Sequence, residues 1–284
     1  MPIDIDKVVG AEIPGSVTEW GPDQVILYHL GLGAGAPPTD PGELAYTYEP
    51  RLKVLPSFGV IPVSGMLLGM AGLEGLSFNP MMLLHGEQDL VLHRPLPTVA
   101  KVENTGRIPA VYDKGKGALV ILETETREVG GEPLCTNRFS AFIRGEGGFG
   151  GERGPEPGNA APERAPDLVV ESPTLPQQAL LYRLNGDKNP LHADPEMARL
   201  GGFDTPILHG LCSFGIVCKA AVDHALDGDV NRVGRYQARF SGVVFPGETL
   251  TTSMWREGDK VLISATTKER DRAVITNAAI TVNP

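Results

Sequence analysis

Basic residues are scarce in this chain relative to acidic ones. Of its 284 residues, 25 are Lys or Arg and 35 are Asp or Glu, so the formal net charge is −10 at pH 7. Binding to nucleic acid through phosphates needs a basic face. The composition therefore argues against a nucleic-acid partner, and any polyanionic ligand must meet a local group of Lys or Arg side chains.

Cysteine is also scarce. The three residues Cys135, Cys212 and Cys218 are odd in number, lack the C-x-x-C spacing and stand among apolar neighbours. This usage favours buried free thiols in a reducing compartment over a disulfide or a metal site.

Targeting and membrane signals are missing as well. Residues Met1–Gly10 have no basic region followed by an apolar core, so they do not resemble a signal peptide. The longest apolar stretch, Val60–Leu73, is broken by Pro62, Ser64 and glycines and is too short to span a bilayer. We therefore expect a cytoplasmic protein without a membrane span.

Aromatic residues make up only 6% of the chain, whereas there are 35 glycines and 25 prolines. Apolar residues still reach 41%, which is enough for a core and excludes general disorder. Glycine and proline concentrate in residues 146–166, which we interpret as a linker. The predicted units are residues 1–145 and 167–284.

The two units share sequence patterns in the same order. Residues Gln24–Leu30 read Q-V-I-L-Y-H-L, and Gln178–Leu184 read Q-A-L-L-Y-R-L. Residues Val120–Glu128 likewise match Val261–Glu269. These matches favour an internal duplication over chance similarity.

Periodicity predicts the same class of structure for each half. In the second half, a long helix is expected to begin near Gly210, followed by strand-like runs up to Val282. Helices followed by an antiparallel meander indicate an α+β fold. We expect each half to pack a long helix on a curved antiparallel sheet.

The segment Tyr182–His192 carries the most informative set of polar side chains. It reads as a loop between two short helices, stiffened by Asn189-Pro190. Such a turn brings the Asp187 carboxylate and the His192 imidazole together, and this pair can share acid and base duty on a water molecule. The Asn189 amide can orient that water because it both donates and accepts hydrogen bonds.

Two other interpretations of this loop remain open from residue types alone. Asp187 and Asn189 often only hydrogen-bond their own backbone, and His192 would then be an ordinary surface residue. Alternatively, Asp187, His192, Asp194 and His209 would bind a metal ion, although their spacing matches no recognised ligand pattern. We expect no metal.

Gly210 directly precedes the predicted long helix. Backbone N–H groups at a helix N-terminus are unpaired and lie at the positive end of the helix dipole. They are suited to hold a developing oxyanion. The alternative is a glycine that only permits close packing between helix and sheet.

These residues resemble a known family. Tyr-x-Leu-x-Gly-Asp-x-Asn-Pro-Leu-His over 182–192, followed by Ala198, is similar to the hydratase 2 motif of the MaoC-like family. That family includes (R)-specific 2-enoyl-CoA hydratases, the hydratase part of peroxisomal multifunctional enzyme type 2 and bacterial 3-hydroxyacyl-thioester dehydratases. Leu84–Gln88 and Phe245–Leu250 also resemble family signatures, and the sequence departs from the motif only at Asn185, where a small residue is usual.

The resemblance implies a double hot-dog fold and roles for individual residues. Asp187 and His192 would form the catalytic pair, Asn189 would orient water or substrate, and the Gly210 N–H would polarise the thioester carbonyl. The implied acyl-CoA contacts are His85, Gly86, Lys114, Lys188, Pro190, Leu191 and Phe240. Lys114 lies in the basic, glycine-flanked segment 113–117, which suits CoA phosphates but also fits an ordinary solvated hairpin tip.

The duplication assigns the chemistry to one half. Aligned with the second half, the first half is expected to be non-catalytic, and the resemblance implies that it accommodates the acyl chain. The aligned pairs are Asp187 with Gly33, Asn189 with Gly35, and His192 with Pro38.

The expected reaction is reversible hydration of a trans-2-enoyl-CoA to a (3R)-3-hydroxyacyl-CoA, by a homodimer that needs no cofactor beyond the CoA of its substrate. A 3-hydroxyacyl-carrier-protein dehydratase and a non-catalytic acyl-CoA-binding scaffold are the alternatives. Acyl chain length and pathway stay open.

Overall fold

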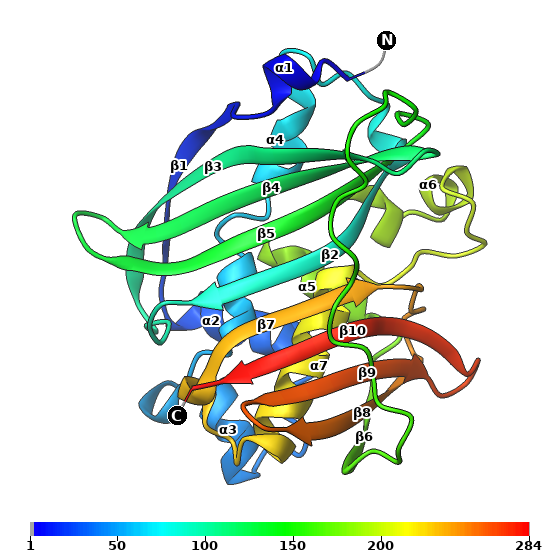
Figure 1. Ribbon diagram of the computed structural model, residues 1–284. Coiled ribbons are helices and arrows are strands. Elements are labelled where there is room, and N and C mark those ends of the chain that lie inside the picture. Colours follow the sequence, from blue (N-terminus) through cyan, green and yellow to red (C-terminus); the bar gives the residue numbers. More distant parts are fainter. Residues whose placement is uncertain (1–2, 284) are drawn as a thin grey trace.

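A single antiparallel sheet forms the body of the computed structural model, which describes residues 3–283 (Figure 1). Its ten strands follow the spatial order β1-β3-β4-β5-β2-β7-β10-β9-β8-β6. Their bounds are β1 (Glu12–Trp20), β2 (Leu83–Leu92), β3 (Ala100–Asp113), β4 (Gly117–Glu128), β5 (Pro133–Arg144), β6 (Leu168–Pro173), β7 (Val233–Phe240), β8 (Thr249–Glu257), β9 (Lys260–Thr267) and β10 (Arg272–Val282).

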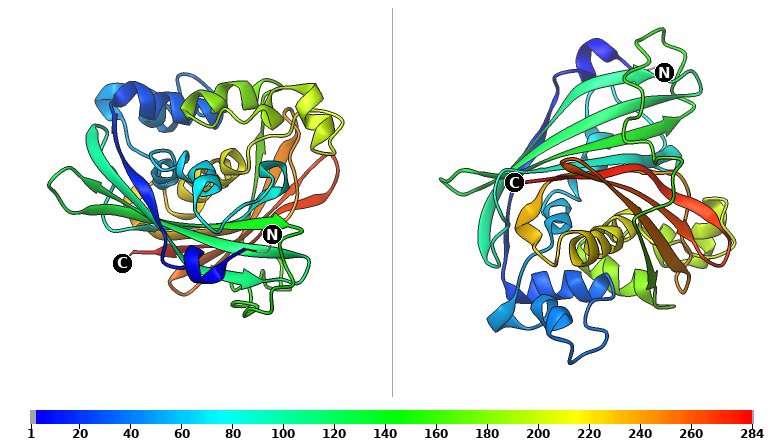
Figure 2. Two further views of the ribbon diagram at one scale, coloured as in Figure 1. Left: turned by 90° about the horizontal axis from the view of Figure 1, so that it is seen from above. Right: turned by 60° about the horizontal axis from the view of Figure 1, so that its bottom comes forward.

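Helices cover one face of the sheet in two layers (Figure 2). The α-helices are α1 (Ile5–Val8), α2 (Pro22–Gly31), α3 (Pro41–Thr47), α4 (Met66–Gly69), α5 (Gln178–Tyr182), α6 (Pro195–Leu200) and α7 (Gly210–Ala225). Short 3-10 helices are η1 (Glu49–Arg51), η2 (Pro56–Val60), η3 (Met70–Gly72), η4 (Pro80–Met82), η5 (Arg183–Asn185), η6 (Pro190–His192) and η7 (Val230–Arg232). Helix α7 lies between the sheet and an outer layer that contains α2 and α5.

The strand order repeats between the two halves. The first half contributes β1-β3-β4-β5-β2, and the second contributes β6-β8-β9-β10-β7 in the opposite direction. The halves join where β2 pairs antiparallel with β7, from Glu87 opposite Arg239 to Val91 opposite Arg235. The predicted α+β double hot-dog is confirmed.

The repeated Gln and Tyr residues have the same structural role in both halves. The Gln24 carboxamide oxygen accepts from the Gly21 N–H at 2.8 Å, and that of Gln178 accepts from the Leu175 N–H at 3.0 Å. Each bond satisfies a backbone N–H at the start of its helix. Tyr28 and Tyr182 are both buried, with ring centroids 6.1 Å apart, where α2 and α5 meet.

The two halves differ in their central helix. Helix α7 has 16 residues, of which 12 are buried, so it packs against the sheet of the second half. The expected long helix of the first half is absent, and that prediction was wrong: its place is taken by η2, the four-residue α4 and η3. Pro56 and Pro62, together with recurring glycines, interrupt the backbone ladder that a long helix needs.

The segment 146–166 contains no helix or strand and crosses the face of the sheet that the helices leave open (Figure 1). It is tied down along its length. The Asp113 carboxylate accepts from the N–H groups of Gly148 and Gly150 at 2.9 and 2.8 Å, and the Asn277 amide donates to the Gly158 carbonyl at 2.8 Å. The link between the halves is therefore held against the sheet.

All three cysteines are buried free thiols, as the sequence predicts. Within residues 3–283, no helix has the length and apolar character that crossing a bilayer requires.

Candidate active site

The loop after α5 places the Asp187 carboxylate through local hydrogen bonds. One carboxylate oxygen of Asp187 accepts from the Asn189 N–H at 3.0 Å, and the Asn189 side-chain oxygen accepts from the Leu191 N–H at 3.0 Å, which caps η6. The backbone bonding considered as an alternative is thus real. It uses one oxygen of Asp187 and leaves the second for other partners.

His192 is not an ordinary surface residue. Its Nδ1 lies 2.8 Å from the Ile207 carbonyl oxygen, and its ring lies over that of His209 with centroids 3.8 Å apart and planes inclined by 30°. Because a carbonyl only accepts, Nδ1 carries the hydrogen and Nε2 keeps its lone pair. Burial lowers the pKa of His192, although the Ile207 carbonyl and the Asp187 charge oppose this, so the imidazole is a neutral proton acceptor near pH 7.

His209 connects this loop to helix α7. Its Nε2 lies 3.2 Å from the backbone oxygen of Asp187, and the residue is 1% exposed. Burial, and then the neighbouring His192, lower the pKa of His209 to about 3, so the ring is neutral. Within the described part of the chain, its Nδ1 has no hydrogen-bond partner.

Gly210, the first residue of α7, follows directly. The described residues offer its N–H no hydrogen-bond partner, as expected for the first turn of a helix. A side chain at this position would meet the Phe240 ring at 3.5 Å, which is ordinary contact. Phe240 in turn contacts His85, with ring centroids 4.9 Å apart. Burial lowers the pKa of His85 to about 4.

The structure therefore gathers most of the predicted residues at one end of the β2–β7 seam. Asp187, His192, Gly210, Phe240 and His85 are linked by the contacts above, and Gly86 adjoins His85 on β2. Leu191 packs near Gly201, while the loop residues Lys188, Asn189 and Pro190 are exposed.

Lys114 is not in contact with this group. It lies in the β3–β4 hairpin, and β3 is three strands away from β2 in the sheet. With about 4.8 Å between neighbouring strands, the separation is roughly 14 Å. The hairpin and the start of β2 nevertheless share one end of the sheet, because Gly117 pairs with Arg144 and Leu83 with Ile143.

One atom each of Asp187, His192 and His209 lies within 4.8 Å of the others, close enough to test against a metal ion. Two histidine ligands must point their in-plane lone pairs at a single ion. Rings inclined by only 30° at 3.8 Å cannot do so, and Asp194 instead caps α6 by accepting from the Glu196 N–H. The arrangement fits acid–base chemistry and not a metal centre.

Sequence reasoning missed two features of the site. It treated His209 only as a possible metal ligand, although the residue joins the loop to α7. It also overlooked that Ser57-Phe58-Gly59 repeats as Ser213-Phe214-Gly215. This repeat was readable in the sequence, and it aligns Val54 with Gly210.

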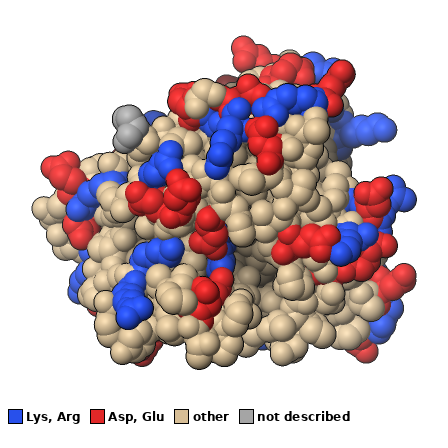
Figure 3. Space-filling view, turned by 90° about the horizontal axis from the view of Figure 1, so that it is seen from below, with Lys and Arg blue, Asp and Glu red and all other residues tan. Residues whose placement is uncertain are grey.

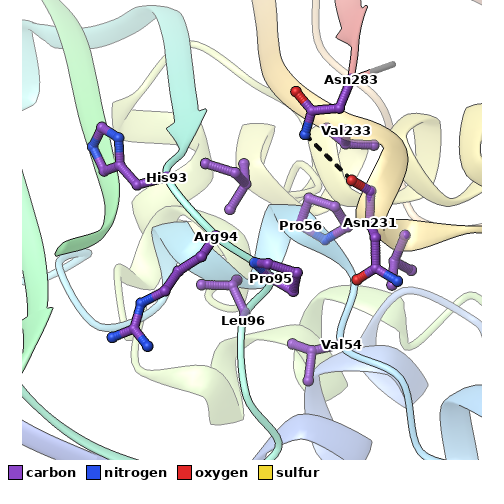
Figure 4. Close-up of a pocket in the computed structure, with 11 residues that line it drawn as sticks. Val54, Pro56, His93, Arg94, Pro95, Leu96, Asn231, Val233 and Asn283 are labelled. Carbon is purple, nitrogen blue, oxygen red and sulfur yellow. Dashed lines mark hydrogen bonds between the residues drawn. The ribbon is translucent and has the colours of Figure 1, made fainter. Parts of the chain in front are cut away.

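A cavity of about 190 Å³ lies at the opposite end of the β2–β7 seam (Figure 4). We call it the counterpart cavity. Its walls include Val54, Leu92 and Val233. Leu92 is the last residue of β2, and Phe240 is the last residue of β7. When the two strands are aligned from these last residues, Val233 of β7 is equivalent to His85 of β2.

Charged residues are mixed on the face in Figure 3, which is hollowed near its centre. Basic and acidic side chains alternate there without forming a continuous positive patch. A polyanionic ligand on this face would depend on individual Lys or Arg residues.

Sequence models of two families cover most of the chain. Residues 19–145 match the MFE-2 hydratase 2 N-terminal domain, and residues 158–278 match the MaoC-like domain.

Proteins of similar sequence include enoyl-CoA hydratase ChsH3 of Mycobacterium tuberculosis, 46% identical over 97% of both chains. The peroxisomal enoyl-CoA hydratase 2 of Arabidopsis thaliana is 41% identical over 95% of this chain and 93% of its own. Among solved structures, a MaoC-like dehydratase from Phytophthora capsici superimposes with a TM-score of 0.87 at 33% identity, covering 99% of this chain and 98% of the other.

Proposed function

The chain belongs to the MaoC-like hydratase 2 family, and on this premise we propose that it adds water reversibly to trans-2-enoyl-CoA, giving (3R)-3-hydroxyacyl-CoA. The enzyme is a hydro-lyase of fatty acyl metabolism. The observation that carries this proposal is the pairing of the Asp187 carboxylate with the neutral His192 imidazole beside the unpaired Gly210 N–H.

In the proposed reaction, Asp187 and His192 hold a water molecule between them. Its oxygen bonds to C3 of the enoyl group while its proton passes to one member of the pair. The pair then delivers that same proton to C2, so the C2–C3 double bond becomes a single bond and both groups return to their starting protonation. Negative charge that develops on the thioester oxygen is stabilised by the Gly210 N–H at the N-terminus of α7.

The remaining predicted residues have binding roles in this proposal. Asn189 would orient water or substrate through its amide nitrogen, since its oxygen is used by the Leu191 N–H. His85, Gly86 and Phe240 would contact the thioester from β2 and β7. Lys188, Pro190 and Leu191 would contact it from the loop. Lys114 would meet CoA phosphates.

The proposal includes the absence of a cofactor, a homodimer and a cytoplasmic location. Free buried thiols support a reducing compartment. Light scattering should give about twice the chain mass of 30.3 kDa. Activity should survive extensive treatment with a strong chelator.

Initial hydration rates on CoA thioesters from crotonyl-CoA to long-chain enoyl-CoA test the function, with the configuration of the product determined. Formation of the (3R) alcohol is expected. The same acyl groups on acyl carrier protein form the second arm. Faster turnover of the carrier-protein thioesters would support the dehydratase alternative, and binding without turnover would support a scaffold.

A further inference from the structure

His209 is a buried polar residue of the site to which the reaction above assigns no role. It lies between the two parts of the site, because it is the N-cap residue of α7 and its ring touches the loop that carries Asp187 and His192. Its backbone carbonyl accepts from the N–H groups of Cys212 and Ser213, so the side chain is not needed to cap the helix.

The neutral His209 ring carries one N–H hydrogen, and its hydrogen bond shows which nitrogen holds it. The Asp187 backbone oxygen only accepts hydrogen bonds, so the 3.2 Å contact places the hydrogen on Nε2. This bond fixes the peptide group of Asp187 itself. At the same time the stacked ring limits how far the His192 imidazole can move toward α7.

The next residue in the chain is Gly210, whose N–H is the proposed oxyanion donor. One side chain thus spans the distance between the acid–base pair and the helix N-terminus. The Tyr182 ring, with its centroid 5.0 Å from that of His209, packs against it within the core and restrains its movement.

We propose that His209 is a positioning residue, which fixes Asp187 and His192 relative to the N-terminus of α7 by donating to the Asp187 carbonyl. This inference rests on the proposed hydratase function. His209 does not touch the reacting atoms, and its neutral ring adds no charge that would compete with His192 for the proton. A displacement of about 1 Å in such a group can reduce turnover about 100-fold.

Two substitutions separate this role from a purely structural one. In His209→Gln the amide nitrogen stands as many bonds from the backbone as histidine Nε2 and can still donate to the Asp187 carbonyl. In His209→Asn the amide is one carbon shorter and cannot reach it. Asn is nonetheless a preferred N-cap residue, so the second variant should keep helix α7, with a lower melting temperature from the smaller buried side chain.

We expect His209→Asn to lower kcat about 10- to 100-fold with KM within about twofold of wild type. His209→Gln should recover kcat to within about fivefold of wild type. His29→Phe is the matched control, because it removes another fully buried histidine, whose hydrogen-bond partners Tyr46 and Leu55 lie outside the site. It should lower the melting temperature without changing kcat of the folded enzyme.

Wild-type enzyme in the same enoyl-CoA assay keeps the two proposals distinguishable. If it does not hydrate any enoyl-CoA, the proposed function fails. If it does, and His209→Asn has wild-type kcat or the Asn and Gln variants lose equal amounts, the positioning role is overturned. A loss of kcat in His29→Phe as large as in His209→Asn would overturn it too.

Discussion

The two ends of the β2–β7 seam differ in the side chains that stand at their matching positions. At one end lie His85 on β2, Phe240 on β7 and the N-terminus of α7. At the other end, the counterpart cavity presents apolar side chains at the matching positions. The matched pairs are Val233 for His85, Leu92 for Phe240 and Val54 for Gly210.

The difference extends to the loops above each end. The second half places a carboxylate and an imidazole on its loop, whereas the first half has Gly33 and Pro38 at the aligned positions. The duplicated scaffold supplies a framework of ten strands, and in the proposed reaction one copy of its loop supplies the acid–base pair.

The largest effect should come from removing the acid–base pair. Asp187→Asn and His192→Gln each preserve size and remove a proton-transfer group, so kcat should fall about 10²–10⁴-fold. The matched change in the first half, Pro38→Ala, alters an exposed residue and should leave kcat unchanged. Steady-state rates on crotonyl-CoA, with circular dichroism to verify folding, measure both.

A comparable loss of kcat in the Pro38 variant would contradict the assignment of the acid–base chemistry to the second half alone. Near-normal turnover by either variant of the pair would remove Asp187 or His192 from the mechanism.

The next effect concerns the helix N-terminus. Gly210→Pro deletes one N–H, and proline is well tolerated at the first position of a helix, while His209 already has the extended backbone that precedes proline (φ −57°, ψ 134°). We expect kcat to fall about 10²–10³-fold. Gly210→Ala keeps the N–H and meets Phe240 at ordinary contact distance, so it should stay within about tenfold of wild type in the same assay. Equal activity of the two variants would exclude the Gly210 N–H as the oxyanion donor.

The contrast between the halves also shows how far sequence reasoning reaches. The duplication, the start of α7 and the convergence of Asp187 with His192 were predictable, because helix periodicity and turn residues act locally. The broken helix of the first half was not predicted, although Pro56 and Pro62 signal it, because the repeat led us to expect equal elements. The role of His209 required tertiary structure, since its partner Asp187 is brought to it only by folding.

Stability should fall with decreasing pH through buried histidines in both halves, because burial lowers the pKa of His29 in the first half and of His209 in the second. His29 in α2 is buried with both ring nitrogens paired, to the Tyr46 carbonyl and the Leu55 N–H, and burial lowers its pKa to about 4. Since the unfolded chain binds this proton near pH 6.5 and the folded chain does not, His29 contributes fully above that pH. Its contribution is lost as the pH falls toward 4.

From the two pKa values, the loss at pH 5 is about 2 kcal/mol. Urea unfolding at pH 7 and pH 5 measures it. His29→Gln should reduce the difference between the unfolding free energies at pH 7 and pH 5. The exposed His224→Gln should leave that difference as it is in the wild type. If the His29 variant keeps the wild-type difference in unfolding free energy between the two pH values, the pH dependence belongs to other groups.

The smallest effect tests whether the active-site end of the sheet also meets the CoA phosphates. Lys114 stands at that end in the β3–β4 hairpin, whereas the exposed Lys101 lies near the opposite end of β3. An exposed ion pair contributes at most about 1 kcal/mol, so Lys114→Ala should raise KM for an enoyl-CoA about fivefold with kcat unchanged. The difference in KM should disappear in 1 M salt, where charges are screened over about 3 Å.

Lys101→Ala is the matched control and should behave as wild type. A pantetheine thioester, which lacks the nucleotide phosphates, should give the same KM for all three proteins. If Lys114→Ala raises the KM of that thioester as well, the hairpin acts on the acyl end, and the positive charge that this acidic protein needs for CoA must come from another basic residue, of which Lys188 in the catalytic loop is the next to test.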